Sequence, residues 1–488
     1  MKGSLSVRTR ACVLAFVAFS CASAQACRPR ETASAPAPSS PRGTGAARGW
    51  HYVVDAKVDA SLLAVQALLP AAFAGTFRVD QGAGPFLHDL EVLGAAGWRA
   101  VRREDDSWSL PECVSRACQV RYQYALGEAA ASLDDVRYAA QRGDALVATP
   151  AVFLLRPQLI PEYERYSFEV RSGKARAFVT GLEQQADGSY GSEGQDLPIA
   201  PYSGFGRFRS LRLRVDGSVI DVAIVPGKFP FGDQRLRRWL LRAARLASSY
   251  FGRFPVPRVL VIIAPSRGRR LFGTQMGGGG ASIYFDIGSD VSEEQLSADW
   301  MGPHEMMHLG QPGLAREHLW FQEGFATYVE PLARLAAGEI SQDELWEGFL
   351  RGMRNGEPEA GDRGLDRTPT WGRTYWGGAL FWLLADVETR RLSGGRRSAR
   401  DAARAVLESV GDCAITASID DVLEAADRGA GHSVFRGLYD RHAPAATSMG
   451  LRRLSDRLGV RLDEARVRYD DDAPWAWIRR SISQRGSQ

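Results

Sequence analysis

The sequence places two histidines, His304 and His308, four residues apart in a His-Glu-Met-Met-His segment. On a helix this spacing puts both imidazoles on one face, one turn apart, where they can share a metal ion. Glu305 lies beside them, turned by about 100°, where a carboxylate can reach a metal-bound water without binding the metal itself. Two imidazoles and one carboxylate leave a coordination place open, which is the arrangement of catalytic zinc. The segment therefore predicts a helix that carries part of a zinc site, and with it a zinc hydrolase.

The third zinc ligand has to come from a second helix. Glu323 begins a helical run, with 14 residues between it and His308. We predict that Glu323 completes the site. Glu317 and His318 lie in the intervening stretch, and either residue is an alternative ligand.

Chance matches to the zinc pattern occur in fewer than roughly one chain in a hundred, because histidine is scarce, with only 7 among 488 residues. The alternative is an amphipathic helix with two ordinary histidines, which would not bring a Glu-Gly-Phe-Ala helix start with it. A metzincin site would need a glycine and a histidine three and six residues after the second histidine. Gln311 and Leu314 occupy those places, which excludes that class.

A chain of 488 residues is too long for a single hydrophobic core, and we predict a multi-domain α+β protein. Residues 49–215 show short alternating segments separated by Gly, Pro and Asp, which is typical of a β-rich, sandwich-like domain. Two stretches inside it, residues 62–69 and 133–140, are predicted to be short helices. Residues 346–488 have mostly helical periodicity and are predicted to form a helical C-terminal domain, with an exposed connection at 362–370.

The central part of the chain, residues 216–345, follows an α/β pattern. A basic amphipathic helix is predicted over residues 233–251 and a buried strand over 258–264. A glycine-rich stretch then leads into a second strand, and the helix of His304 comes next. This order is typical of a thermolysin-like α/β catalytic domain.

The first residues have the pattern of a secretory leader, with basic residues, a short apolar run and a closing set of small residues. We predict a signal peptide at residues 1–26 and a flexible linker rich in Pro, Ala, Ser and Gly at 27–48. The protein is therefore expected to be exported, to a periplasmic or extracellular location. A further hypothesis is that Cys27 is acylated and tethers the mature chain to a membrane.

The charge of the chain does not favour a nucleic-acid partner. The formal net charge is +4, and removing Lys2, Arg8 and Arg10 with the leader leaves about +1. No cluster of basic residues with interleaved aromatic residues stands out.

The cysteines outside the leader predict one local bridge. Cys113 and Cys118 are five residues apart, and in an exported protein a disulfide is the expected use. A zinc ribbon would need a second cysteine pair. Cys413 has no evident partner and is predicted to be a buried free thiol.

Three sequence blocks together resemble the gluzincin metallopeptidases. The first is the segment from His304 to His308, the second is Trp-Phe-Gln-Glu-Gly-Phe-Ala-Thr-Tyr at residues 320–328, and the third begins Tyr-Trp-Gly-Gly-Ala-Leu at Tyr375. The chain is most similar to the glycyl aminopeptidase family and more distantly to the aminopeptidase N family. The resemblance covers most of residues 50–480 and implies a zinc-dependent peptidase with this domain order.

The resemblance also assigns roles to individual residues. His304, His308 and Glu323 would bind Zn²⁺, Glu305 would be the general base, and Tyr375 would hydrogen-bond the oxyanion. Zinc, base and phenol hydroxyl are chemically suited to these roles. The alternative for the tyrosine is an aromatic residue at a helix start, packed in the core. The family of aminopeptidase N has eighteen residues between the second histidine and the glutamate ligand, four more than this chain.

The glycine-rich stretch departs from the aminopeptidase pattern. We place substrate binding at Gly278, Gly279, Gly280 and Ala281, where related aminopeptidases carry a glutamate that holds the substrate's α-amine. No acidic residue is present here, so aminopeptidase and endopeptidase action both remain open. Gly377 also replaces a lysine of the third block.

The predicted function is an exported zinc metallopeptidase that hydrolyses peptide or protein substrates. Two alternatives belong to other classes. One is a catalytically silent surface or binding protein on a gluzincin scaffold, and the other is a zinc hydrolase of non-peptide bonds.

Overall fold

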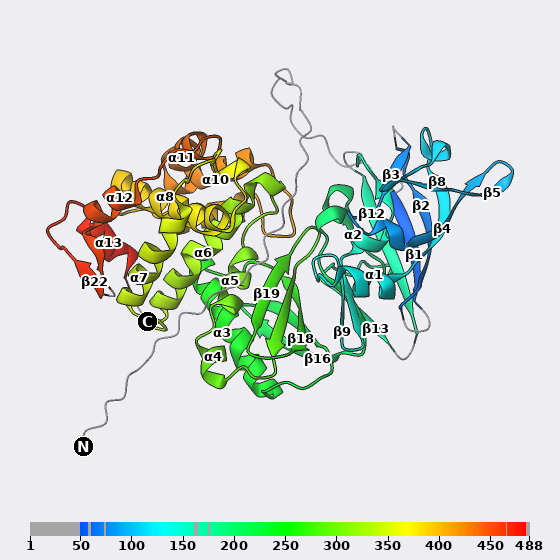
Figure 1. The fold of residues 1–488 in the computed structure, drawn as a ribbon, viewed down its shortest axis with the longest axis horizontal. Helices are drawn as coiled ribbons and strands as arrows, with labels where there is room; N and C mark the ends of the chain where they lie inside the picture. Colours follow the sequence, from blue (N-terminus) through cyan, green and yellow to red (C-terminus); the bar gives the residue numbers. More distant parts are fainter. Residues whose placement is uncertain are drawn as a thin grey trace. The chain divides into compact units, whose positions relative to one another are not determined.

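The computed structural model describes residues 49–56, 60–72, 75–160, 164–173, 176–464 and 466–484. The predicted signal peptide and linker, with Cys27, lie outside these residues. All the described residues belong to one compact unit, which begins with sheets and continues with helices (Figure 1). Within the described ranges, no helix has the length and apolar content needed to cross a bilayer. The multi-domain α+β prediction is confirmed at the level of the fold.

The N-terminal region consists of three sheets with the strand orders β14-β12-β1-β2-β8-β4-β5, β13-β15-β10-β9 and β11-β3-β7-β6. Buried and exposed side chains alternate strictly along β2 and β8, so one face of the large sheet covers the core and the other meets solvent. The strands are β1 (Gly49–Ala56), β2 (Leu63–Leu69), β3 (Thr76–Arg78), β4 (Leu87–Gly94), β5 (Gly97–Ala100), β6 (Arg103–Glu104), β7 (Ser107–Ser109), β8 (Cys118–Tyr124), β9 (Ala139–Arg142), β10 (Ala145–Ala148), β11 (Arg156–Pro157), β12 (Arg165–Ser172), β13 (Ala177–Thr180), β14 (Tyr190–Glu193) and β15 (Ser203–Gly206). The helical pieces are η1 (Gly84–Phe86), η2 (Pro111–Cys113), α1 (Leu126–Leu133), α2 (Pro150–Phe153) and η3 (Gly194–Ile199).

Both short helices predicted in this region are wrong. Residues 62–69 contain β2, because Leu63, Val65, Ala67 and Leu69 are buried while the residues between them are exposed, a period of two. Residues 133–140 follow a helix instead of forming one, since α1 ends at Leu133 and Asp134 adopts the left-handed conformation that terminates it.

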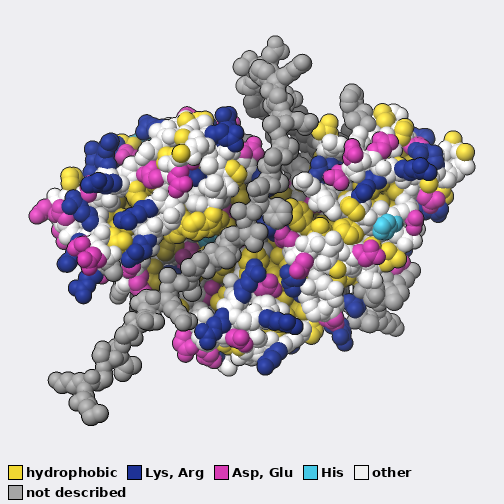
Figure 2. All heavy atoms as spheres, viewed as in Figure 1, with side chains coloured by type: hydrophobic (Ala, Val, Ile, Leu, Met, Phe, Trp, Pro, Cys, Tyr) yellow, Lys and Arg dark blue, Asp and Glu magenta, His cyan; other side chains and the backbone are white. Residues whose placement is uncertain are grey.

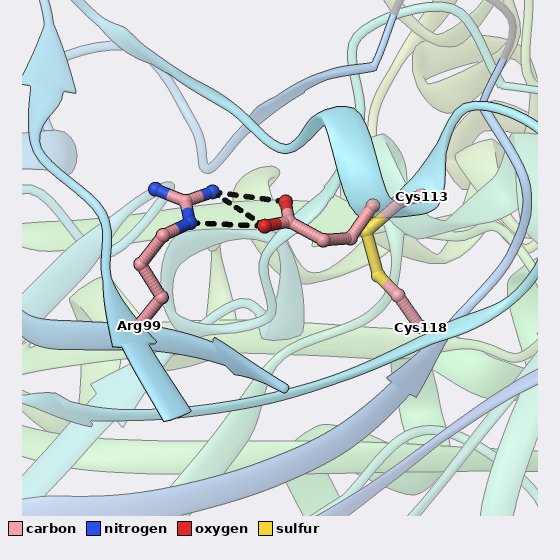
Figure 3. The surroundings of a disulfide bond; sticks show 4 residues. Arg99, Cys113 and Cys118 are labelled. Atoms are coloured by element: carbon pink, nitrogen blue, oxygen red, sulfur yellow. Dashed lines mark hydrogen bonds and ion pairs between the residues drawn. A yellow bond between two sulfur atoms is a disulfide. The ribbon is translucent and has the colours of Figure 1, made fainter. Parts of the chain in front are cut away.

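The predicted cysteine chemistry is confirmed. Cys113 and Cys118 form a disulfide (Figure 3), and Cys413 is a buried free thiol. Beside the disulfide, the guanidinium of Arg99 donates to both carboxylate oxygens of Glu112, with Nε–Oε1 and Nη2–Oε2 distances of 2.9 Å. The disulfide therefore ties η2 to the start of β8, and the ion pair ties η2 to the edge strand β5.

Replacing Cys113 and Cys118 together by serine is expected to lower the free energy of unfolding by about 2 kcal/mol. The effect is modest because the bridge closes a short loop, which removes little entropy from the unfolded chain. Urea unfolding followed by circular dichroism measures the difference between the two proteins. A variant as stable as the wild type would show that the bridge adds nothing to the folded state.

A five-stranded mixed sheet follows, with the order β16-β17-β18-β20-β19. Its central strands β17, β18 and β20 are parallel, and the edge strands β16 and β19 are antiparallel to their neighbours. β18 and β20 are almost fully buried, as expected for parallel strands covered on both faces. The strands are β16 (Arg209–Val215), β17 (Ser218–Ile224), β18 (Arg258–Ser266), β19 (Leu271–Met276) and β20 (Ser282–Gly288).

The predicted helix over residues 233–251 is confirmed as α3 (Asp233–Phe251), which connects β17 to the parallel strand β18. Its apolar face packs on the core shared with the sheet. The predicted domain boundary after residue 215 lies at the turn of the β16–β17 hairpin. The boundary after residue 345 lies inside α7 (Gln342–Gly352).

The rest of the chain is mainly helical, as predicted, with one added hairpin of β21 (Val460–Asp463) and β22 (Arg466–Tyr469). The remaining elements are α4 (Glu293–Ser297), α5 (Met301–His308), η4 (Arg316–His318), α6 (Leu319–Ala336), η5 (Met353–Gly356), η6 (Leu365–Arg367), the π-helix η7 (Gly372–Gly377), α8 (Gly378–Ser393), α9 (Ala399–Ser409), α10 (Ile419–Ala430), α11 (Val434–His442), α12 (Leu451–Leu458) and α13 (Ala476–Ile482).

Helices α6 and α8 cross backbone against backbone. A Cβ built on Gly324 would lie 2.2 Å from the carbonyl carbon of Gly378, and one on Gly378 would lie 2.0 Å from the backbone oxygen of Trp320. Only glycine fits at both places. The crossing therefore sets the position of α6 at the turn next to Glu323.

The connection at residues 362–370 was predicted to be exposed, and this is wrong in part. Leu365 is buried, and the carboxylate of Asp366 accepts hydrogen bonds from Trp320 Nε1 at 2.7 Å and from the Tyr439 hydroxyl at 2.9 Å. The polar sequence gives no sign of these contacts, because the partners of the half-buried Asp366 lie far away along the chain.

Basic and acidic side chains are interspersed over the face shown in Figure 2. This mixed surface agrees with the small net charge and shows no large single-sign field on that face.

Candidate metal centre

Helix α5, which carries the two histidines, starts at a carboxylate cap. Asp299 Oδ1 accepts from the Met301 N–H at 2.9 Å, and Oδ2 accepts from the Gly302 N–H at 2.8 Å. The Trp239 Nε1–H also donates to Oδ2, at 2.9 Å, which ties the cap to α3. Such a cap satisfies N–H groups that the first helical turn leaves without partners. The start of α5, and with it His304, is fixed by the sheet-covering helix.

Three ligand atoms converge between α5 and α6. Glu323 Oε2 lies 3.3 Å from His304 Nε2 and 3.4 Å from His308 Nε2, and the two imidazole nitrogens are 3.3 Å apart. Donor atoms that bind zinc tetrahedrally at about 2.0–2.1 Å lie about 3.3–3.4 Å from one another. The donor set of two imidazoles and one carboxylate is that of catalytic zinc. Both the chemistry and the spacing of the three atoms therefore fit a zinc ion.

The electrostatics of Glu323 and His304 favour metal binding, whereas the ring of His308 has to release its proton when a metal binds. Burial would raise the pKa of Glu323, but the charge of His308 and hydrogen bonds with both imidazoles hold that pKa well below its usual range. Burial lowers the pKa of His304, which keeps its ring neutral. For His308, burial acts in the same direction, but the charge of Glu323 outweighs it and raises the pKa. A carboxylate anion and imidazoles are the forms in which these side chains bind zinc.

Glu305 lies apart from the three ligand atoms, against the edge strand β19. It is 5% exposed, and burial raises its pKa to about 8. A Cβ built on Gly273 would lie 2.8 Å from Glu305 Cγ, and the backbone of Gln275 hydrogen-bonds to the carboxyl group. A carboxyl group that exchanges its proton near neutral pH is suited to act as a general base or acid.

Tyr375 comes from the π-helix η7 and lies beside His304. The two rings are 6.5 Å apart between centroids, with planes inclined by 27°. Burial, reinforced by the charges of Glu323 and Glu305, raises the pKa of Tyr375 far above its usual value. Its hydroxyl group therefore keeps its proton and is available as a hydrogen-bond donor beside the site.

The fold has counterparts among solved structures. The chain is similar to an aminopeptidase N family protein from Idiomarina loihiensis, with a TM-score of 0.63 and 15% identity, over 84% of this chain and 78% of that protein. It is also similar to an M1 zinc metallopeptidase mutant from Deinococcus radiodurans bound to a Tyr-Ser-Ala substrate, with a TM-score of 0.52 and 12% identity, over 82% and 96% of the two chains. A third similar structure is a two-domain M1 zinc metallopeptidase mutant bound to L-arginine, with a TM-score of 0.50 and 13% identity, over 82% of this chain and 94% of that protein. The fold is that of the M1 zinc metallopeptidases.

The gluzincin resemblance is thus confirmed by the M1 fold. No profile of a protein family matches the sequence, and no curated protein matches it as a relative. The likeness lies in the structure, and at these levels of identity it shows the fold alone.

The two alternative ligands, Glu317 and His318, do not belong to the group of ligand atoms that gather between α5 and α6. Glu317 is exposed on η4, and His318 Nδ1 lies 3.0 Å from Asp366 Oδ1. Within the described part of the chain, the ligand atoms that gather are those of His304, His308 and Glu323. The shorter connection between the two ligand helices does not keep them apart.

The glycine-rich segment at residues 278–281 is hydrogen-bonded through its backbone to residues 413–414 and to Gly181. The Gly278 N–H donates to the Cys413 carbonyl at 2.9 Å, and the Gly279 N–H donates to the Ala414 carbonyl at 2.8 Å. Both glycines have positive φ, 88° and 78°, which favours glycine there. Substrate binding by this segment stays a prediction, and the two N–H groups named here are used within the fold.

Sequence reasoning missed Asp299 and Gly273. Asp299 could have been found, since an aspartate shortly before a helix is a cap signal. Gly273 gave no signal, because its importance comes from the approach of Glu305 across the fold.

Proposed function

We propose that this protein is an exported zinc metallopeptidase that hydrolyses peptide bonds. The observation that carries the proposal is the triangle of His304, His308 and Glu323, whose three ligand atoms are spaced for zinc on an M1 fold. The roles of base and hydrogen-bond donor are supported by the buried carboxyl group of Glu305, next to His304 in the chain, and by the ring of Tyr375, 6.5 Å from that of His304. The peptide substrate named for one solved M1 protein, Tyr-Ser-Ala, agrees with this assignment.

The chain's own groups account for the proton movements of peptide hydrolysis. Zinc, when bound, supplies a Lewis acid that acidifies water and polarises a carbonyl group. The Glu305 carboxylate accepts the proton of the attacking water and then delivers it to the nitrogen of the leaving amine. The Tyr375 hydroxyl donates a hydrogen bond to the carbonyl oxygen as that oxygen gains negative charge. Burial of Glu305 brings its pKa near neutrality, which suits both halves of its task.

Two measurements test the proposal. Metal analysis of the purified protein should find about one zinc per chain. Mass spectrometry of a defined peptide pool should then show cleavage that stops when the metal is chelated. Zinc-loaded protein that leaves every peptide intact would contradict the peptidase assignment. Cuts confined to the first residue would identify an aminopeptidase, and internal cuts an endopeptidase.

Export is supported by the leader-like first residues and by the Cys113–Cys118 disulfide, because disulfides persist in oxidising compartments. We propose a periplasmic or extracellular location, with Cys27 as the site of a lipid tether. The mass of the N-terminal peptide from cell-derived protein tests both points. Protein that keeps Met1 and stays in the cytoplasm would contradict export.

Tyr375→Phe is expected to lower kcat by about 10²–10³-fold, because it removes one donor to the developing oxyanion. The zinc content and KM should change little, since the ring and its packing on His304 remain. Steady-state kinetics on a peptide identified in the pool measures the effect. A kcat close to that of the wild type would mean that Tyr375 is a packed core residue without a catalytic role.

A further inference from the structure

The π-helix that carries Tyr375 is unusual in both geometry and burial. η7 spans Gly372–Gly377, and π turns are rare and are frequently found at functional sites. Arg373 and Thr374 are buried in it, while Tyr375 is half-buried and faces His304. A guanidinium group is thus held inside the protein two residues before the tyrosine.

A buried carboxylate is the partner of that guanidinium. Arg373 Nε lies 2.7 Å from Asp362 Oδ2, and the side chains are 4% and 3% exposed. The Gly364 N–H donates to Asp362 Oδ1 at 2.7 Å, which fixes the carboxylate. Arg373 Nη1 also donates to the carbonyl of Gly356, on η5. One guanidinium therefore connects the π-helix to two separate segments.

One of these segments, η5, packs on the π-helix backbone without space between them. A Cβ built on Gly356 would lie 2.4 Å from the Gly377 nitrogen, and one on Gly372 would lie 2.3 Å from the Asn355 carbonyl oxygen. The π-helix therefore rests directly on η5 at both of its ends. If it relaxed toward α-helical geometry, Tyr375 would turn relative to His304.

A buried ion pair is costly to desolvate, and its presence is weak support for stability alone. Such pairs are best attested where they select one arrangement among several. The planar guanidinium suits this role, because its donors are fixed in direction and reach two acceptors at once. Arg373 forms an ion pair with Asp362 and donates a hydrogen bond from Nη1 to η5, so it holds one contact to each of two segments.

We propose that the Arg373–Asp362 pair is a positioning device that holds the π-helix so that the Tyr375 hydroxyl points at the reacting carbonyl. The inference rests on the proposed function of Tyr375. Neither Arg373 nor Asp362 touches the substrate, and both act through the tyrosine.

Two variants test the pair. Asp362→Asn keeps the shape of the side chain and removes its charge. The double variant Asp362→Leu with Arg373→Met removes both charges, so no unpaired charge stays buried if the first variant folds poorly. Each is expected to keep its zinc and its KM and to lose about 10- to 100-fold in kcat, because a small misplacement of a catalytic group has effects of that size.

Two readouts separate positioning from general damage. In a Tyr375→Phe background, the Asp362→Asn change should lower kcat by less than about threefold, because residues that act as a unit are not additive. A peptide analogue with a tetrahedral phosphinate should lose affinity by the same factor as kcat, since it engages groups that serve the transition state. As a matched control, Glu347→Gln breaks the exposed Glu347–Arg351 pair on α7 and should change neither value.

The outcomes distinguish this inference from the proposed function. Additive losses in the Tyr375→Phe background, or full kcat in a folded double variant, overturn the positioning role and leave the peptidase assignment intact. Zinc loss in both variants also overturns it, since the pair would then hold the metal-binding helices. A wild-type protein that binds zinc, cleaves no peptide and ignores the phosphinate overturns both.

Discussion

Glu305→Gln is expected to keep its zinc and to lose turnover by about 10²–10⁴-fold. The amide fills the same buried space beside Gly273, so α5 and its ligands stay in place. It cannot accept a proton from the attacking water, however, and that step loses its base. Zinc analysis and kcat on a cleaved peptide, measured on one preparation, check the two halves of the expectation.

The control for this variant is Glu317→Gln, on the exposed η4 between the two ligand helices. It changes the same chemical group and should retain wild-type turnover. If Glu305→Gln retained more than about a tenth of the activity, the general base would have to be a different group. If it lost zinc, Glu305 would be a ligand and the interpretation of the triangle would change.

Glu323→Ala is expected to remove zinc from the protein. The anionic carboxylate supplies one of three ligand atoms and lies within 3.4 Å of both imidazoles. Loss of a direct ligand should weaken zinc binding by more than the roughly 10- to 100-fold typical of the groups that only orient ligands. Dialysed protein should then contain less than about a tenth of an equivalent of zinc.

Thermal unfolding gives a second readout of the same change. A metal that binds only the folded state raises Tm, so a chelator should lower the Tm of the wild type and leave that of Glu323→Ala unchanged. His318→Ala is the matched control, because its ring pairs with Asp366 outside the triangle and its loss should leave the zinc content intact. Full zinc in Glu323→Ala would place the third ligand at another residue.

The convergence of His304, His308 and Glu323 could be predicted because its determinants are local. On a helix, the spacing of His304 and His308 places both side chains on the same face, and Glu323 follows at the start of the next predicted helix. The sequence predicts Glu323 as the third ligand, but it could not exclude Glu317 or His318. That choice depends on how α6 packs, and the structure shows Glu317 turned to solvent and His318 bound to Asp366.

The errors in the fold have physical causes. Residues 62–69 are mostly apolar, so helical and strand periods fit nearly equally well, and only pairing with β1 and β8 decides for a strand. The connection at 362–370 is rich in charged and turn residues, and the carboxylates of Asp362 and Asp366 find partners only in the tertiary structure. The π-helix has no pattern in the sequence that distinguishes it from an ordinary helix start.

The close crossing of α6 and α8 at glycine makes the position of Glu323 depend on α8, a helix that carries none of the three candidate ligands. Because Gly324 follows Glu323 directly, any added methyl group there would push the whole α6 backbone outward from α8. A substitution at Gly378 is therefore expected to shift Glu323 relative to His304 and His308. Gly324 and Gly378, which set the spacing of α6 and α8, are therefore the positions at which to alter the geometry of the site without changing its histidines.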